Sequence, residues 1–130
     1  MSQKPIELIL MRQLASTLAM PIFLVDADGT LVFYNEPAER VLGMRFDETG
    51  EMPEGEWSTL WHSTDVAGRP LTPEELPLMI AIAERKPTHT EFWIHGLDGE
   101  RRRIKATAFP LMSLTDQVLG AVVFFWEAAS

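Results

Sequence analysis

The chain has 130 residues, of which 46% are hydrophobic and 23% charged, values typical of one globular domain rather than a disordered or fibrous chain. It has no cysteine, which excludes disulfides, thiolate metal sites and cysteine nucleophiles. The net charge of -8 makes nucleic acid an unfavourable partner, because phosphate repels an acidic surface. No apolar run reaches the roughly 18 residues of a membrane helix. We therefore expect no membrane insertion and a cytoplasmic protein.

Residues 6–19 carry the apolar periodicity of an amphipathic helix, which Pro21 ends. Charged and polar residues interrupt its apolar stretch, so it does not fit a signal sequence. The side chains on its broad apolar face are Leu10, Met11, Leu14, Ala15 and Leu18. We assign residues 1–19 to an N-terminal cap helix and residues 20–130 to the domain that follows.

Two β-rich runs on either side of an Asp-Gly turn predict a β-hairpin over residues 21–34. Asn35 is then a good N-cap for a short helix that ends at Gly43. Residues 44–71 look irregular, with room for a short helix around residues 57–62. This part of the chain separates the hairpin from the rest of the domain.

Thr72 begins a second helix, because Pro73 and Glu75 complete a capping-box sequence after it. We expect this helix to extend to residue 86, with Pro77 disturbing its first turn. Leu76, Met79, Ile80 and Ala83 lie on one face of this helix.

The last third predicts three strands at 88–95, 101–112 and 117–127, of which the first two alternate between apolar and polar residues. The side chains expected to face the core from the first two strands are Thr90, Phe92, Ile94, Ile104, Ala106 and Ala108. Five strands with the helices gathered between them indicate an α+β fold.

The final strand is apolar on both sides, so we expect both faces of the sheet to be covered. The N-terminal helix is the natural cover for the outer face, in its own subunit or in a partner's. We favour a homodimer, while a monomer that covers its own sheet is the alternative. The candidate interface residues are Leu10, Leu14, Leu18, Trp93, Phe109, Val122, Phe124 and Trp126.

Several segments, taken in order, carry a family resemblance. They are the hairpin around Asp28-Gly29, Asn35 to Gly43, Gly68 to Pro77, Asp98 to Arg102, Ala108 to Leu111 and Gly120 to Val122. The ordered set over residues 20–127 resembles a PAS domain, a sensory module of bacterial signalling proteins. The resemblance implies a five-stranded antiparallel sheet in the order 2-1-5-4-3, with helices on one face around a possible ligand cavity. It also implies that the N-terminal helix is a flanking cap that commonly mediates dimerisation.

Residue parity and the resemblance together predict the cavity walls. They are Phe23, Val25, Phe33, Val41, Leu42, Leu60, Trp61, Met79, Ile82, Phe92, Ile94, Ile104, Ala106, Val123 and Phe125. Such an apolar lining favours a colourless ligand such as a fatty acid, and an ordinary packed core is the alternative. The missing cysteine excludes the cysteine-linked flavin of some family members. The helix from residue 72 to 86 has no histidine, which argues against haem.

Other chemistry-bearing residues have simpler explanations. His89 and His95 lie too far apart on one strand to share a metal, and His62 is best read as a solvent-facing side chain, so we expect no metal site. The run from Arg101 to Arg103 is either a solvated strand or a docking site for an acidic partner. No nucleophile motif or phosphate-binding glycine loop is present.

We therefore interpret the chain as a non-catalytic sensory module that acts through ligand-dependent or partner-dependent protein interaction. A small α+β enzyme with an apolar pocket is one alternative, and it would need an aspartate or glutamate inside the cavity. A ligand-free dimerisation module is another. If the 130 residues are the whole protein, it must signal through a separate protein partner. The sequence identifies neither the ligand, the signal nor that partner.

Overall fold

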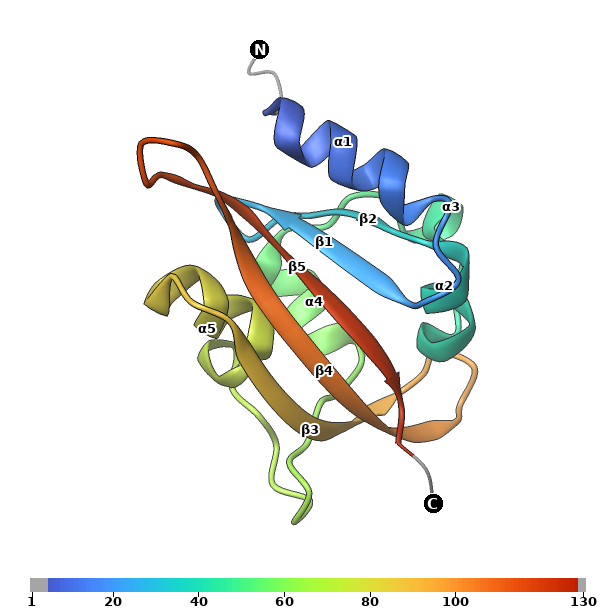
Figure 1. The fold of residues 1–130 in the computed structure, drawn as a ribbon. Coiled ribbons are helices and arrows are strands. Elements are labelled where there is room, and N and C mark those ends of the chain that lie inside the picture. Colours follow the sequence, from blue (N-terminus) through green and yellow to red (C-terminus); the bar gives the residue numbers. More distant parts are fainter. Residues whose placement is uncertain (1–4, 129–130) are drawn as a thin grey trace.

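The computed structural model describes residues 5–128, and these form one five-stranded antiparallel sheet with helices on both faces (Figure 1). In chain order the elements are α1 (Ile6–Ala15), β1 (Ile22–Asp26), β2 (Leu31–Tyr34), α2 (Glu36–Leu42), α3 (Phe46–Thr49), α4 (Glu54–Leu60), the 3-10 turn η1 (Pro73–Glu75), α5 (Pro77–Glu84), β3 (Thr88–His95), β4 (Arg101–Met112) and β5 (Val118–Glu127). The strand order is β2-β1-β5-β4-β3, which confirms the expected α+β fold and topology.

The sheet separates two apolar clusters. The larger one lies between the inner face of the sheet and helices α2, α4 and α5. The smaller one lies under α1, which packs across β1 and β5 on the outer face (Figure 1). The final strand is therefore covered on both sides within one chain, as its two apolar faces require: Val122 contributes to the outer cluster and Val123 to the inner one.

α1 is shorter than predicted and rotated relative to its expected buried face. It ends at Ala15, and it buries Leu8 and Ala15 against the sheet, while Leu10 and Leu14 are 55% and 49% exposed. The reason is that this helix is apolar on two sides, so periodicity alone could not show which side the sheet would take.

The helix predicted over residues 72–86 is interrupted. Thr72 and Glu75 form the expected capping box, but it closes only the turn η1, and α5 begins afresh at Pro77. The cause is Pro77, which pushes Leu76 into extended backbone at φ -74° and ψ 143°. In α5 the buried residues are Pro77, Leu78 and Ala81, whereas Ala83, which shares a face with Leu76 in the predicted helix, is exposed.

Between residues 44 and 71 the structure has two short helices, α3 and α4, where a single one was expected around residues 57–62. α4 begins three residues earlier than that, at Glu54, directly after Pro53. α4 ends at Leu60, so it carries Trp57 in its last turn and places Trp61, four residues later, at its C-terminal cap.

Candidate functional site

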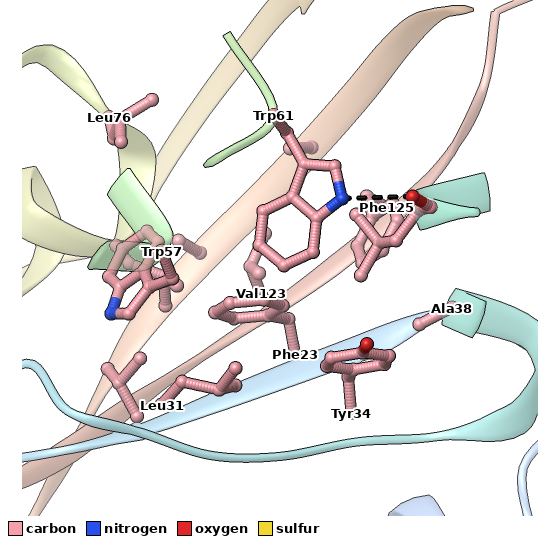
Figure 2. Packing of buried hydrophobic residues seen from close by; sticks show 14 of the residues in the cluster. Phe23, Leu31, Tyr34, Ala38, Trp57, Trp61, Leu76, Val123 and Phe125 are labelled. Carbon is pink, nitrogen blue, oxygen red and sulfur yellow. Dashed lines mark hydrogen bonds between the residues drawn. The ribbon is translucent and has the colours of Figure 1, made fainter. Parts of the chain in front are cut away.

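Four aromatic side chains fill the space between the inner face of the sheet and α4. Phe23 of β1 stacks on Tyr34 of β2, with ring centroids 5.9 Å apart. Trp57 on α4 and Trp61 directly after it meet the ring of Phe23 edge-on at 5.2 and 6.0 Å. Figure 2 shows the two indoles projecting from the helix layer toward Phe23 and Tyr34. Edge-to-face contacts of this kind hold rings in defined positions.

The polar atoms of these rings are bonded to backbone carbonyls around the site. The indole N–H of Trp57 donates to the carbonyl of Gly29 at 2.7 Å, and that of Trp61 donates to the carbonyl of Leu42 at 2.9 Å. The Tyr34 hydroxyl donates to the carbonyl of Met44 at 2.9 Å, and burial raises the pKa of its phenol. The rings of Tyr34, Trp57 and Trp61 are therefore each fixed at both the apolar body and the polar tip.

A cavity of ≈ 70 Å³ remains between these rings, the sheet and the start of α5. Its lining residues are Phe23, Leu42, Trp57, Trp61, Ser63, Leu76, Pro77, Leu78, Phe92, Ile94, Ile104, Ala106, Val123 and Phe125. Nine of these fourteen were predicted from the sequence, mainly the inward residues of the strands. The small side chain of Ala106 leaves part of this space open.

Other predicted wall residues lie elsewhere. Val41 and Val25 are buried in the inner cluster but do not line the cavity. Met79, Ile82 and Leu60 are partly buried and pack against the inner cluster.

Phe33 was predicted to line the cavity and instead lies on the opposite face of the sheet. It packs in the outer cluster, 5.4 Å from the ring of Phe46 and under the guanidinium of Arg12. A β-bulge explains the error: Val25 pairs with Leu31, but Leu24 pairs with Phe33, so β2 holds one extra residue. Simple alternation along β2 therefore assigns the wrong face.

Sequence reasoning missed five lining residues: Trp57, Ser63, Leu76, Pro77 and Leu78. Trp57 had a usable signal, since it lies four residues before Trp61 and i,i+4 side chains share a helix face. Ser63 comes from a loop, Pro77 and Leu78 begin α5, and Leu76, which was expected on the apolar face of the predicted helix, directly precedes it.

The lining supports apolar contact and little else. Ser63 supplies its only polar side-chain atom apart from the two indole nitrogens, which are already bonded. It contains no aspartate, glutamate or histidine, so the cavity lacks the acid or base that the enzyme alternative requires. No lining residue is a histidine, methionine or cysteine that could ligate haem iron, and the Ser63 hydroxyl is the one free polar side-chain group that the lining offers to the polar edge of a flavin.

The size of the cavity is a second constraint. Pockets for drug-sized ligands occupy roughly 300–1,000 Å³, whereas this cavity measures ≈ 70 Å³. Small apolar cavities stay dry and accept molecules such as benzene or xenon. A long fatty-acid chain does not fit this conformation unless the tryptophans move.

The arginine run of β4 divides between the two faces of the sheet. Arg102 points toward α2 and bonds Asp98 at 2.8 Å, Glu127 at 3.2 Å and the carbonyl of Val41 at 3.0 Å. The bond from Arg102 lowers the pKa of Asp98 to about 2, so this carboxylate stays ionised at neutral pH. Arg102 is therefore a structural clamp rather than part of an exposed docking strip.

Arg101 and Arg103 point outward and are engaged locally. Arg101 lies over the ring of Trp93 at 4.1 Å, and Arg103 pairs with Glu91 at 2.9 Å. Trp93, a candidate interface residue, is thus partly covered by its own chain.

The ring of His62 lies 6.2 Å from that of His95 on the surface, outside the cavity. Within residues 5–128, no three histidine or carboxylate side chains group as a metal site would require. Over the same residues, no helix is long and apolar enough to cross a membrane.

The outer face carries an apolar surface around α1. Ile6, Leu10 and Leu14 recur at every fourth residue along the exposed side of α1, with exposures of 65%, 55% and 49%. Beside the helix, Phe109 and Phe124 stack at 5.7 Å in the outer cluster, both half-buried. Of the other candidate interface residues, Trp126 is 39% exposed, Leu18 is half-buried and Val122 is fully buried. We call Ile6, Leu10 and Leu14 the α1 stripe.

This chain was compared with protein families, curated proteins and solved structures. The model of a family described as the PAS fold matches residues 9–127. The PAS domain of a protein from Colwellia psychrerythraea is similar, with a TM-score of 0.67 and 18% identity over 92% of this chain and 97% of that one. A Rhodobacter sphaeroides LOV protein has a TM-score of 0.73 and 12% sequence identity, over 96% of this chain and 69% of that one. The PAS domain of Bordetella pertussis BvgS has a TM-score of 0.61 and 14% sequence identity, over 95% of this chain and 87% of that one. The search of curated proteins found no match.

Proposed function

Since the chain belongs to the PAS family, whose domains are generally sensory, non-catalytic signalling modules, we propose that it senses a small apolar molecule and reports it through protein contacts. The observation that carries this proposal is the cavity of ≈ 70 Å³, lined almost entirely by apolar side chains and walled by two anchored tryptophans. A molecule that enters displaces no bound polar group, so its affinity comes from dispersion and apolar burial. A cytoplasmic location and a signalling-protein partner remain predictions.

Native and denaturing mass spectrometry of freshly purified protein, with an absorption spectrum, test the ligand directly. We expect a small extra mass that is lost on denaturation and no visible absorbance. Xenon under pressure serves as a defined probe small enough for this cavity, and we expect it to raise the melting temperature of the wild-type protein. Ala106→Leu fills the cavity from its β4 wall and should abolish both effects while the fold is retained. No bound mass together with no response to xenon would remove the sensing part of the proposal.

We further propose that a second copy of the chain covers the α1 stripe, since PAS domains commonly dimerise and two-fold dimers are the commonest assembly. The stripe and the neighbouring Phe109–Phe124 pair form one apolar surface beside a helix that is already docked, so a partner helix could add to it without unfolding. Exposed apolar surface of this kind usually marks an interface.

Leu10→Glu tests the dimer. A charge at the centre of the α1 stripe should shift the native mass from dimer to monomer, because an unpaired carboxylate is costly in an apolar interface. Val66→Glu is the matched control: Val66 is 64% exposed in the loop after α4, away from this surface, and its substitution should leave the mass unchanged. A dimer that survives Leu10→Glu would show that the interface is elsewhere.

A further inference from the structure

We propose that α2 is a strut that couples the cavity to α1, with Trp61 bonded at one end of it and Asn35 at the other. This inference rests on the proposed function, because it names how occupancy of that cavity would be passed on. It assigns the coupling to a seven-residue helix on the inner face of the sheet rather than to the sheet itself.

The C-terminal end of α2 is bonded to the cavity wall. The carbonyl of Leu42 accepts the indole N–H of Trp61 and the backbone N–H of Leu97, both at 2.9 Å. The carbonyl of Val41 accepts a bond from Arg102 at 3.0 Å. Leu42 also lines the cavity beside Trp61. Because the cavity is small and Trp61 forms part of its wall, a change in its contents acts on the indole that holds this end of α2.

The N-terminal end of α2 is bonded to α1 through one buried side chain. The Asn35 amide oxygen accepts the N–H of Ala38, in the first turn of α2, at 3.2 Å and the N–H of Ile22, at the start of β1, at 3.0 Å. Its amide nitrogen donates to the carbonyls of Ala15 at 3.0 Å and Met20 at 2.9 Å. Ala15 is the last residue of α1, so one side chain joins the two helices.

Few other contacts hold α1. Leu8 and Ala15 are its only buried residues, Met11 packs partly buried against the outer cluster, and Arg12 adds a contact over the rings of Phe33 and Phe46. An element with few buried contacts opens locally rather than by global unfolding. The population of docked α1 is therefore sensitive to the bonds that Asn35 makes, and α1 is also the element whose outer stripe we assign to the dimer.

Two tryptophans provide a matched test. Trp57→Phe and Trp61→Phe each remove one buried indole bond from the same cavity wall, and the two residues are 6% and 4% exposed. They differ in the acceptor: Trp57 bonds Gly29 in the hairpin turn, whereas Trp61 bonds α2. Hydrogen–deuterium exchange of the full chain, read on peptides that cover α1, compares the two variants without any ligand.

We expect Trp61→Phe to accelerate exchange in α1 by about threefold or more, in line with the loss of one hydrogen bond. Trp57→Phe should leave the exchange rate of α1 within error of that in the wild-type protein. Equal effects of the two variants on α1 would overturn the proposal, because they would reflect loss of core packing alone.

Asn35→Ser completes a double-mutant cycle. Serine keeps an oxygen that can cap Ala38, but it lacks the amide donors for Ala15 and Met20. If the strut runs through Asn35, Trp61→Phe adds no further acceleration in the Asn35→Ser background. Additive effects would place the coupling elsewhere, for example in the sheet. The double-mutant cycle uses no ligand, so additive effects would rule out only the coupling through α2. Ligand sensing is tested separately, by mass spectrometry.

Discussion

Asn35→Ala should lower the free energy of unfolding by about 4 kcal/mol, the largest effect we expect from a single side chain. Asn35 is 2% exposed and makes four hydrogen bonds that join α1, β1 and α2. The truncation leaves the N–H groups of Ile22 and Ala38 without their acceptor and removes the helix cap. Each unsatisfied buried group costs about 1–3 kcal/mol. Urea denaturation followed by circular dichroism measures the change.

Glu36→Ala is the control for this experiment. Glu36 is the next residue in the chain, and its carboxylate forms a surface ion pair with Arg40 at 2.8 Å, with both side chains largely exposed. Such pairs contribute little, so we expect a change of less than about 0.5 kcal/mol. If Asn35→Ala cost no more than this control, the four bonds would not hold the three elements together.

Gly43→Ala should destabilise the protein by about 3 kcal/mol or more, for two separable reasons. Gly43 ends α2 at φ +80°, where a side chain is strained. In addition, a Cβ atom at this position would lie 2.5 Å from the backbone nitrogen of Asp98 and 2.8 Å from that of Leu97. Backbone atoms of a tight turn cannot move aside as a flexible side chain can, so α2 and the β3–β4 turn would have to separate.

Gly68→Ala separates the two causes. Gly68 has φ +93°, but a Cβ atom there would meet nothing within 4 Å. It should therefore show the strain alone, about 1 kcal/mol. Thermal and urea denaturation of both variants give the difference, which reports the close approach of α2 to the turn. Equal losses in the free energy of unfolding for Gly43→Ala and Gly68→Ala would mean that the β3–β4 turn moves to accommodate the Cβ atom, and that α2 does not pack tightly against it.

The sequence predicted best the elements whose signals are local. The helix between Asn35 and Gly43 has a capping side chain and a left-handed stop within its own segment, and the structure has both. β3 and β4 were recognised from their alternation and β5 from its continuous apolar run, and neither signal needs knowledge of distant residues. The five-stranded order came from the family resemblance, and the fold confirms it.

The predictions that went wrong depend on contacts between distant segments. One extra residue in β2 moved Phe33 to the outer face, and its pairing with β1 cannot be read from either strand alone. Pro77 restarted α5 and turned a different face inward. The two apolar sides of α1 were visible in the sequence, but only docking on the sheet decided that Leu8 would be buried and Leu10 exposed.

By itself, then, the sequence determined the fold class, the inward faces of β3 and β4 and the apolar character of the interior, because periodicity and capping act over a few residues. Only the tertiary structure decided the size of the cavity and the path from it to α1. Both depend on how α4 lies against the sheet, which places Trp57 and Trp61 over Phe23 and joins Trp61 to the end of α2. Packing between segments far apart in the chain sets that position, and no local pattern carries it.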